Sequence, residues 1–297
     1  MKFKGLTTDW RRNRPANSLR RLAFVKENPA VFTNNAITKI KSIIFQDHLT
    51  KAIGATMDIS ANHDGSVCAY LSRDCSTLYI GAKGGINAEK CEFLFDGLNS
   101  VERIEFEDHS FHTDEATDFT CMFANCRKLK TLNVRDFNTS KAESFGDMFH
   151  GCESLTTLNL KGFDTSSSTD FRDMFSGCRS LELLDITSFQ IHLAVRWAKY
   201  FDERCDSVWF RVPPKISGMF SGCESLKSLD LRSFNTCDVN HFTKLFENCA
   251  SLETLLLSKS FVIRSDTDTS RMFAGCKKLD IAGLGLNLTP KQAEDAL

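Results

Sequence analysis

The sequence predicts an α/β repeat fold, a leucine-rich-repeat-like solenoid in which short parallel strands and short helices stack behind a β-rich amino-terminal cap. Three observations predict it. A Met-Phe-x-Gly/Asn-Cys signature recurs along the chain, a ladder of leucines follows most copies, and a phenylalanine recurs at nearly one offset beyond the ladder. A unit this short cannot bury a core alone, so its regular recurrence indicates units that stack on one another.

The signature has a period of about 26 residues. Its copies begin at Met122, Met148, Met174, Met219, Leu245 and Met272, with a degenerate copy at Leu94. The steps between them are 28, 26, 26, 45, 26 and 27 residues. The one long step indicates an insertion of about 19 residues between the third and fourth full copies.

Each unit is expected to begin with a helix of about two turns. In the third copy Phe171, Met174, Phe175 and Cys178 fall at i, i+3, i+4 and i+7, the spacing that lines one face of a helix. The residue before the repeat cysteine is Gly or Asn in all six full copies. These two residues tolerate the left-handed backbone that ends helices, so this position looks constrained by backbone geometry.

A short half-buried strand should follow each turn. In the second copy Leu155, Leu158 and Leu160 form a Leu-x-x-Leu-x-Leu pattern, and the last two leucines alternate with polar residues. Stacked in parallel, such strands lie about 4.8 Å apart. The recurring phenylalanines are then expected to fill the core; they are Phe137, Phe163, Phe189, Phe234 and Phe261.

These repeats resemble those of the BspA-like leucine-rich-repeat family of bacterial surface proteins. The match is close from Met148 to Met174 and from Met219 to Leu245. The segments Asp58-Ile-Ser and Thr77-Leu-Tyr-Ile resemble the strand-rich cap that precedes such repeats, so the resemblance covers about residues 42–286. It implies a non-enzymatic surface or secreted protein that acts in adhesion and protein binding.

The domain organisation follows from the repeats. We expect a basic arm at 1–41, a β-rich cap at 42–93, the solenoid at 94–286 with its insertion at 190–215, and a capping helix at 287–297. Residues 1–30 hold no apolar run of signal-peptide length, and no segment is long enough to span a membrane. We therefore expect a cytoplasmic protein or a component of a particle, and only the resemblance suggests a surface location.

Charge is unevenly distributed. Residues 1–45 hold ten Lys or Arg against two Asp or Glu, which is a net charge of +8. Because the whole chain has a net charge of −1, residues 46–297 carry −9. The densest basic cluster contains Arg11, Arg12, Arg14, Arg20 and Arg21. Such an arm suits nucleic acid, an acidic partner or an anionic surface, and the alternative is that it packs against the acidic repeats.

Half of the 12 cysteines occupy one repeat position: Cys126, Cys152, Cys178, Cys223, Cys249 and Cys276. We expect these to be stacked, buried thiols that fill small core sites. Stacked neighbours can come within bridging distance, so the spacing alone does not exclude disulfides. Without a signal peptide, a reducing compartment is favoured.

No catalytic motif is found. The sequence lacks a phosphate-binding glycine loop, a dinucleotide fingerprint and a nucleophile elbow, so we expect a protein that is not an enzyme and uses no cofactor. His109, His112, Cys121 and Cys126 are four zinc-type ligands close in sequence, but their spacing fits no familiar zinc site and Cys126 belongs to the core position. We therefore expect no metal site.

The outward strand positions form the candidate binding face, because they build one continuous surface in a solenoid. The alternative is that they are merely solvated strand residues. Short hydroxyl and amide groups with charges of both signs favour a protein partner, with a glycan as the second choice. The candidate residues are Thr131, Asn133, Arg135, Thr157, Asn159, Lys161, Asp185, Thr187, Asp230 and Arg232.

The insertion is the second candidate. We expect an amphipathic helix over 192–204 and a strand over 207–212, closed by Pro213-Pro214. Loops inserted on one face of a repeat protein often carry function. Its aromatic residues are either exposed interface anchors or a small core of their own; they are Trp197, Tyr200, Phe201, Trp209 and Phe210.

Three functions remain open. The first is a non-enzymatic protein-recognition or adhesion module. The second is a structural or assembly component of a phage particle or surface complex, with its oligomeric state unknown. The third is a nucleic-acid-associated protein that uses the basic arm, whose binding should weaken steeply with salt.

Overall fold

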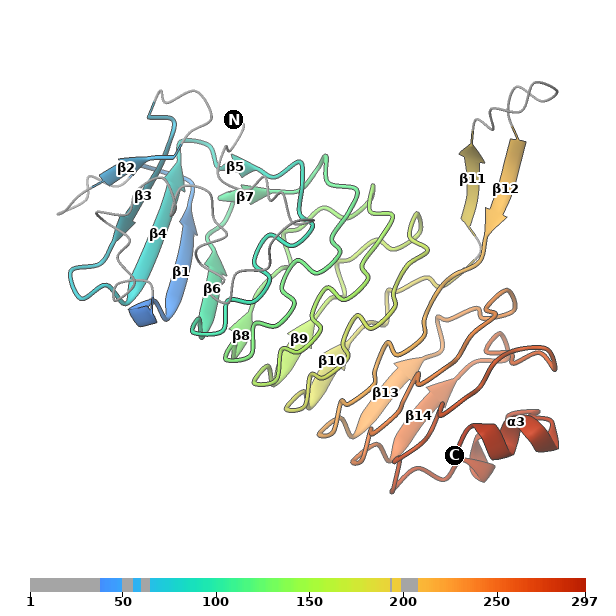
Figure 1. The fold of residues 1–297 in the computed structure, drawn as a ribbon. Coiled ribbons are helices and arrows are strands. Elements are labelled where there is room, and N and C mark those ends of the chain that lie inside the picture. Colours follow the sequence, from blue (N-terminus) through green and yellow to red (C-terminus); the bar gives the residue numbers. More distant parts are fainter. Residues whose placement is uncertain (1–37, 50–55, 60–64, 193, 199–207) are drawn as a thin grey trace, which may run out of the picture.

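A computed structural model describes residues 38–49, 56–59, 65–192, 194–198 and 208–297 (Figure 1). Its strands are β1 (Ser42–Gln46), β2 (Thr56–Asp58), β3 (Val67–Leu71), β4 (Thr77–Ala82), β5 (Ile86–Asn87), β6 (Arg103–Phe106), β7 (Phe111–His112), β8 (Thr131–Leu132), β9 (Thr157–Asn159), β10 (Leu183–Asp185), β11 (Ala194–Ala198), β12 (Val208–Val212), β13 (Ser228–Leu231) and β14 (Thr254–Leu257). The helical elements are η2 (Ala282–Leu284) and α3 (Pro290–Asp295).

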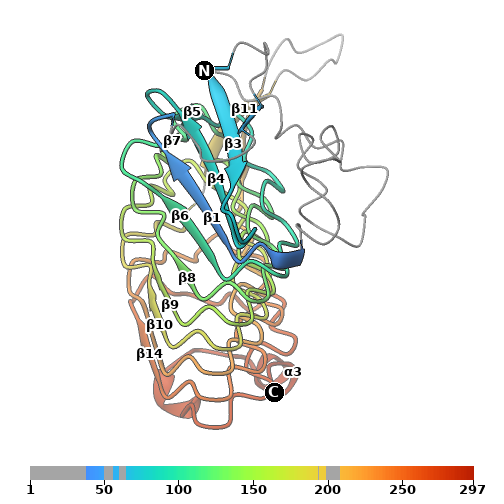
Figure 2. The ribbon, with the colours of Figure 1, turned by 90° about the vertical axis from the view of Figure 1, so that its left-hand side faces the viewer.

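The amino-terminal strands and the first repeats share one sheet. Its order is β2-β3-β4-β1-β6-β8, so β1 lies between β4 and β6 and pairs with both in parallel. β9 pairs with β10 and β13 with β14, also in parallel and without a register shift. The parallel strands that the leucine pattern predicts are therefore confirmed, and Figure 2 shows them as successive rungs on one side of the molecule.

The predicted helix in each repeat is wrong. Among the described residues of the repeats, 94–192 and 212–278, the segment that carries the Met-Phe signature is a succession of tight turns. Asp147 and Gly151 in the second full copy have φ values of 56° and 69°, as do Asp173 and Gly177 in the third at 53° and 74°. Two left-handed residues four positions apart cannot belong to one right-handed helix.

These turns divide their backbone N–H groups between two tasks. Each repeat forms one coil of the stack. The amides of Met148 and His150 bond within their own coil: Met148 donates to the carbonyl of Phe145 at 3.2 Å, and His150 donates to the carbonyl of Asp147 at 3.0 Å. The alternate amides bond to the next coil, as Asp147 does with the carbonyl of Arg172 at 2.8 Å and Phe149 with the carbonyl of Met174 at 2.9 Å. The turn segments thus form a second inter-coil ladder, on the side of the coil away from the strands.

The core between the two ladders is aromatic and aliphatic. A column of phenylalanine rings, one from each coil, runs through this core, and the centroids of neighbouring rings are 5.2–5.7 Å apart. The rings belong to Phe95, Phe123, Phe149, Phe175, Phe220, Phe246 and Phe273. The phenylalanines that follow the strands are buried as expected, because Phe163 is 2% and Phe189 0% exposed. Stacked and edge-on pairs add to the free energy of burial.

The repeat cysteines are reduced, and all are fully buried except the half-buried Cys276. Each thiol donates to the carbonyl of a phenylalanine one coil earlier, as Cys152 does to Phe123 at 3.2 Å and Cys178 to Phe149 at 3.1 Å. Burial raises the pKa of Cys178 to about 12. The thiol hydrogen bonds therefore connect consecutive coils.

The insertion leaves the stack between two coils that remain directly bonded. The amide of Phe171 bonds to the carbonyl of Lys215 at 2.9 Å, and the amide of Lys215 bonds to the carbonyl of Thr169 at 2.8 Å. The helix expected over 192–204 is wrong for residues 194–198, because these residues form the strand β11, which pairs antiparallel with β12. Figure 1 shows this hairpin pointing away from the stack.

The carboxyl end closes the stack with the predicted helix. Thr289 caps α3 with a capping box to Gln292, and Pro290 is its first residue. The side-chain amide of Gln292, which is 5% exposed, donates to the carbonyls of Arg264 and Thr267 at 2.7 and 3.0 Å. None of the helices in the described residues is long and apolar enough to cross a membrane.

The second left-handed position of the turns gives a direct test. We expect Gly177→Ala to lower the free energy of unfolding by about 1–2 kcal/mol, because Gly177 has φ +74°, a left-handed backbone that strains an alanine. Gly162→Ala is the control, since Gly162 has no left-handed backbone. Urea titration of both variants measures the difference, and equal stabilities would contradict the role of the turn.

The insertion should be removable without unfolding the stack. Ala194 and Val212 are directly paired, so residues 195–211 can be replaced by Asn-Gly, which suits a two-residue hairpin turn. We expect the melting temperature to change by no more than about 2 °C, because shortening a loop alters little free energy.

Removal of the whole of 190–215 is the matched comparison and should be damaging. It deletes Gln190, whose amide donates to Thr165 Oγ1 at 2.7 Å, and Lys215, whose carbonyl accepts from Phe171. Thermal melts followed by circular dichroism compare the two variants. Equal losses from both deletions would show that the hairpin itself supports the stack.

Candidate binding surface on the strand face

The outward positions of the strands form three rows across the coils, and we call this surface the strand face. The first row is Thr131, Thr157, Leu183, Ser228 and Thr254; the middle row is Asn133, Asn159, Asp185, Asp230 and Leu256; the third row is Arg135, Lys161, Thr187, Arg232 and Ser258. Cα pairing aligns Thr157 with Leu183 and Asn159 with Asp185, and it aligns Ser228 with Thr254 farther along. Of the sequence candidates, Asp185 and Asp230 are half-buried and the rest are exposed: Thr131, Asn133, Arg135, Thr157, Asn159, Lys161, Thr187 and Arg232. The structure brings all ten onto this one face.

The middle row has a structural task that the sequence reasoning missed. The side-chain oxygen of Asn159 accepts from the amide of Lys161 at 3.0 Å, and that of Asp185 accepts from the amide of Thr187 at 3.1 Å. In the same way, Asn133 accepts from the amide of Arg135 at 3.2 Å, and Asp230 accepts from the amide of Arg232 at 3.0 Å. These Asx turns end each strand, so one oxygen of each middle-row side chain is already engaged.

The third row carries most of the positive charge. Arg135 pairs with Asp108 at 3.0 Å, and Arg232 pairs with Asp230 at 2.6 Å. The guanidinium of Arg232, by its hydrogen bonds, holds the pKa of the Asp230 carboxyl below its ordinary value. Lys161 lies between these two arginines in the row, and no ion pair is found for it among the described residues.

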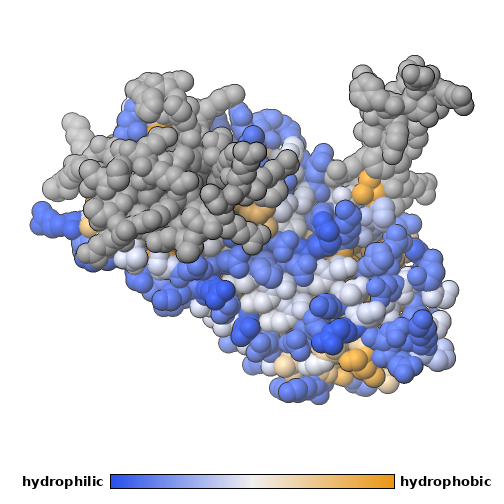
Figure 3. All heavy atoms as spheres, in the orientation of Figure 1, coloured by the Kyte–Doolittle hydropathy of each residue, from blue (hydrophilic) through white to orange (hydrophobic). Residues whose placement is uncertain are grey.

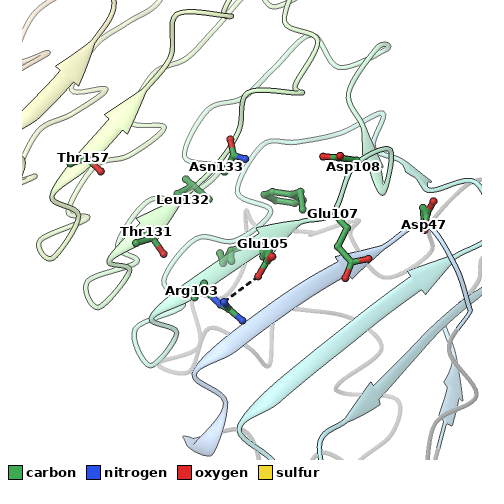
Figure 4. Close-up of a pocket in the computed structure, with 11 residues that line it drawn as sticks. Asp47, Arg103, Glu105, Glu107, Asp108, Thr131, Leu132, Asn133 and Thr157 are labelled. Atoms are coloured by element: carbon green, nitrogen blue, oxygen red, sulfur yellow. Dashed lines mark ion pairs between the residues drawn. The ribbon is translucent and has the colours of Figure 1, made fainter.

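A groove of about 710 Å³ opens on the strand face where the cap sheet meets the first repeats. Ile104 is buried beneath it, and the half-buried side chains of Phe106 and Leu132 also line it. Figure 4 shows the polar groups that surround it; they are Asp47, Arg103, Glu105, Glu107, Asp108, Thr131, Asn133 and Thr157. Four of these are carboxylates and one is an arginine, so the groove is acidic.

Apolar side chains interrupt the polar rows farther along the face. Leu183 is 66% exposed and Leu256 is 41% exposed, and both hold outward strand positions. Figure 3 shows a mainly polar described surface in its view, with apolar atoms near the carboxyl-terminal end. Single exposed leucines are ordinary on protein surfaces, but on this face they add apolar contact area.

Two of the four zinc-type ligands considered in the sequence have other partners. Cys126 is fully buried and donates to the carbonyl of Phe95, and His112 Nε2 lies 3.3 Å from the carbonyl of Gly84. Among the described residues, Asp47, His48 and Glu107 do place their ligand atoms within 4.8 Å of one another. Both Asp47 and His48 are exposed, and such clusters are common without an ion.

Several sequence candidates cannot be placed. The arginines of the arm, Tyr200 and Phe201 lie outside the described residues. Trp197 and Trp209 are directly opposite each other in the β11–β12 hairpin, but their side chains, like that of Phe210, are not described. Whether these aromatics act as interface anchors therefore stays a prediction.

Comparison with known protein families decides where this chain belongs. Residues 89–208 and 212–284 match the family described as "Mycoplasma protein of unknown function, DUF285". The chain belongs to the DUF285 family. The match begins just before the degenerate first copy and ends in η2, so it spans the repeats and leaves out strands β1 to β5. The DUF285 description assigns no activity, and a search of curated proteins finds no match.

Among solved structures, this DUF285 chain is similar to the crystal structure of a T. pallidum leucine-rich repeat protein. The two share 20% sequence identity with a TM-score of 0.42, over 76% of this chain and 96% of the other.

The DUF285 repeats also place titratable groups on the turn side. Asp147 and Asp173 occupy the same left-handed position in consecutive coils, and His150 Nδ1 lies 3.8 Å from Asp147. Desolvation, and then the charge of Asp173, raises the pKa of Asp147. Desolvation also raises the pKa of Asp173. This pair carries no signal in the sequence, because each aspartate alone is an ordinary turn residue.

We expect Asp147→Asn to raise the melting temperature by about 1–2 °C at pH 7. Because the folded pKa is raised, the native state binds more protons than the unfolded state in the window above the unfolded value near 3.8. The unaltered chain therefore loses stability as the pH rises through that window, and the asparagine variant does not. Asparagine also tolerates the left-handed backbone at this position.

Melts between pH 3 and pH 8 measure the effect. The gain should vanish near pH 3, where Asp147 is protonated in both states. The exposed Asp136 provides the control variant Asp136→Asn. A variant that is less stable than the unaltered chain at pH 7 would show that the carboxylate is stabilising there.

Proposed function

We propose that the chain is a non-enzymatic protein-recognition module that binds its partner on the strand face. The repeats form a leucine-rich-repeat-like solenoid in this proposal, and the stack serves to hold the outward rows in register. The observation that carries it is the coincidence of the ordered rows with the groove on one face, which no other described part of the chain covers. Repeat proteins commonly use such a continuous face for binding.

The chemistry of the face favours a protein over a small molecule. Threonine, asparagine and paired charges alternate with exposed Leu183 and Leu256 across successive coils. The groove is a shallow hollow on an extended surface, whereas pockets for small ligands are usually enclosed and mostly apolar. The resemblance to BspA-like surface repeats supports adhesion as the setting, and a glycan is the alternative ligand.

A second candidate is a structural or assembly component. The hairpin of β11 and β12 favours it, because this two-stranded sheet leaves the stack and pairs with no other strand among the described residues. An isolated two-stranded hairpin is marginally stable in water, so a neighbouring subunit that covers it would stabilise it. An assembly component should sediment as a large particle.

The test is a native pull-down from the source organism, with proteins identified by mass spectrometry. The bait is compared with the double variant Thr157→Arg/Leu183→Arg, which places two long charged side chains on the strand face without touching an Asx turn. We expect a partner to be retained by the unaltered chain and depleted at least tenfold by the variant. Sedimentation of the same extract reports any large particle.

The control is Thr117→Arg, an exposed threonine in the segment that leads into the turns. It should retain the partner fully. Loss of the partner with both substitutions would point to non-specific charge effects, and equal retention by all three chains would exclude the strand face. Recovery of many subunits in one particle by every variant would favour the assembly component.

A further inference from the structure

We propose that the groove at the junction of cap and repeats is occupied by the chain's own basic arm, the segment from Trp10 to Arg21. The inference concerns an internal docking site and stands whether or not the strand face has a foreign partner. It rests on the shape of the groove, its charge, and the point at which the described chain begins.

The groove suits an arginine-bearing segment in shape. Phe106 and Leu132 offer partly exposed apolar surface, and the carboxylates of Glu105, Glu107 and Asp108 surround it (Figure 4). An arginine can lay its aliphatic stem and flat guanidinium on apolar or aromatic surface while its N–H groups reach a carboxylate. The groove therefore offers both halves of such a contact.

The charges that line the groove are not balanced locally. Arg103 pairs with Glu105 at 3.3 Å, and Arg135 pairs with Asp108 at 3.0 Å. Glu107 instead accepts a hydrogen bond from the neutral amide of Gln46 at 3.0 Å. Asp47 lies 3.0 Å from His48 Nδ1. Four carboxylates therefore face two arginines and one histidine, which leaves an acidic excess. The segment from Trp10 to Arg21 carries five arginines and no acid.

The arm is attached beside the groove. The described chain begins at Thr38, and Ser42 at the start of β1 is directly paired with Arg103, a groove residue. Residues 22–37 separate the basic cluster from Thr38 and span up to about 50 Å when extended. The tether is therefore long enough to return the cluster to the groove of its own chain.

Tethering makes a weak contact effective. Individual ion pairs at exposed sites contribute little, so the free arm would bind the groove poorly. A tether of this length raises the local concentration of the arm to the order of millimolar. Occupancy should then be intramolecular, independent of protein concentration, and reduced by salt because the charges are exposed.

Photo-crosslinking on the full chain tests the proposal. p-Benzoylphenylalanine replaces Thr131, an exposed groove residue, and in a second chain it replaces Thr254, the outward residue in the same row at the far end of the face. Digestion at acidic residues releases the arm as one peptide, residues 10–27. We expect that peptide to be linked to position 131 and not to position 254.

The double variant Glu105→Gln/Glu107→Gln should lower the yield at position 131 by roughly tenfold. Circular dichroism of this variant checks that it remains folded. Mixing ¹⁵N-labelled and unlabelled chains separates the two sources of the arm, since a docked arm of the same chain gives no mixed-isotope products. Mixed products, equal yields at both positions, or no arm peptide at position 131 would each overturn the proposal.

Discussion

The structure depends on the hydrogen bonds that the turn segments exchange between coils. Left-handed residues such as Asp147 and Gly151 turn alternate amides toward the next coil, while the other amides close turns within their own coil. The turns therefore tie consecutive coils together along the stack, and paired strands add a second tie where β6 meets β8, β9 meets β10 and β13 meets β14. The phenylalanine column and the cysteine thiols fill the space that these two ladders enclose, and their spacing follows from the backbone.

The sequence predicted the strands better than the turns. Leucines that alternate with polar residues have one interpretation, whereas apolar residues at i, i+3, i+4 and i+7 fit both a helix and a chain of turns that reverses every four residues. The Gly or Asn before each repeat cysteine was correctly attributed to a left-handed backbone. The first left-handed position gave no such signal, because it holds Cys121, Asp147, Lys244 and Arg271 among others. Tertiary hydrogen bonds impose that conformation on residues that do not prefer it.

A buried threonine ladder explains where the insertion is tolerated. Thr139 and Thr165 are buried, and each hydroxyl donates to the carbonyl of one residue in the next coil and accepts from the amide of that same residue. The residue is Asp164 for Thr139 and Gln190 for Thr165. The equivalent position after Phe189 is Ile191, which cannot continue the ladder. The chain leaves the stack just beyond it. This pattern is readable in the sequence, in the threonines that follow the core phenylalanines by two residues, once the hydrogen bonds give it a meaning.

The groove could not be located from the sequence, because its walls come from distant segments. Asp47 follows β1, whereas Arg103 to Asp108 belong to β6 and its continuation, and they meet only because β1 is placed between β4 and β6. The regular rows, by contrast, follow directly from the repeat. A uniform face repeats the same chemistry at every coil, so it cannot by itself position a ligand along the stack. The irregular places, where the cap joins and where the leucines interrupt the rows, are what distinguish one position on this surface from another.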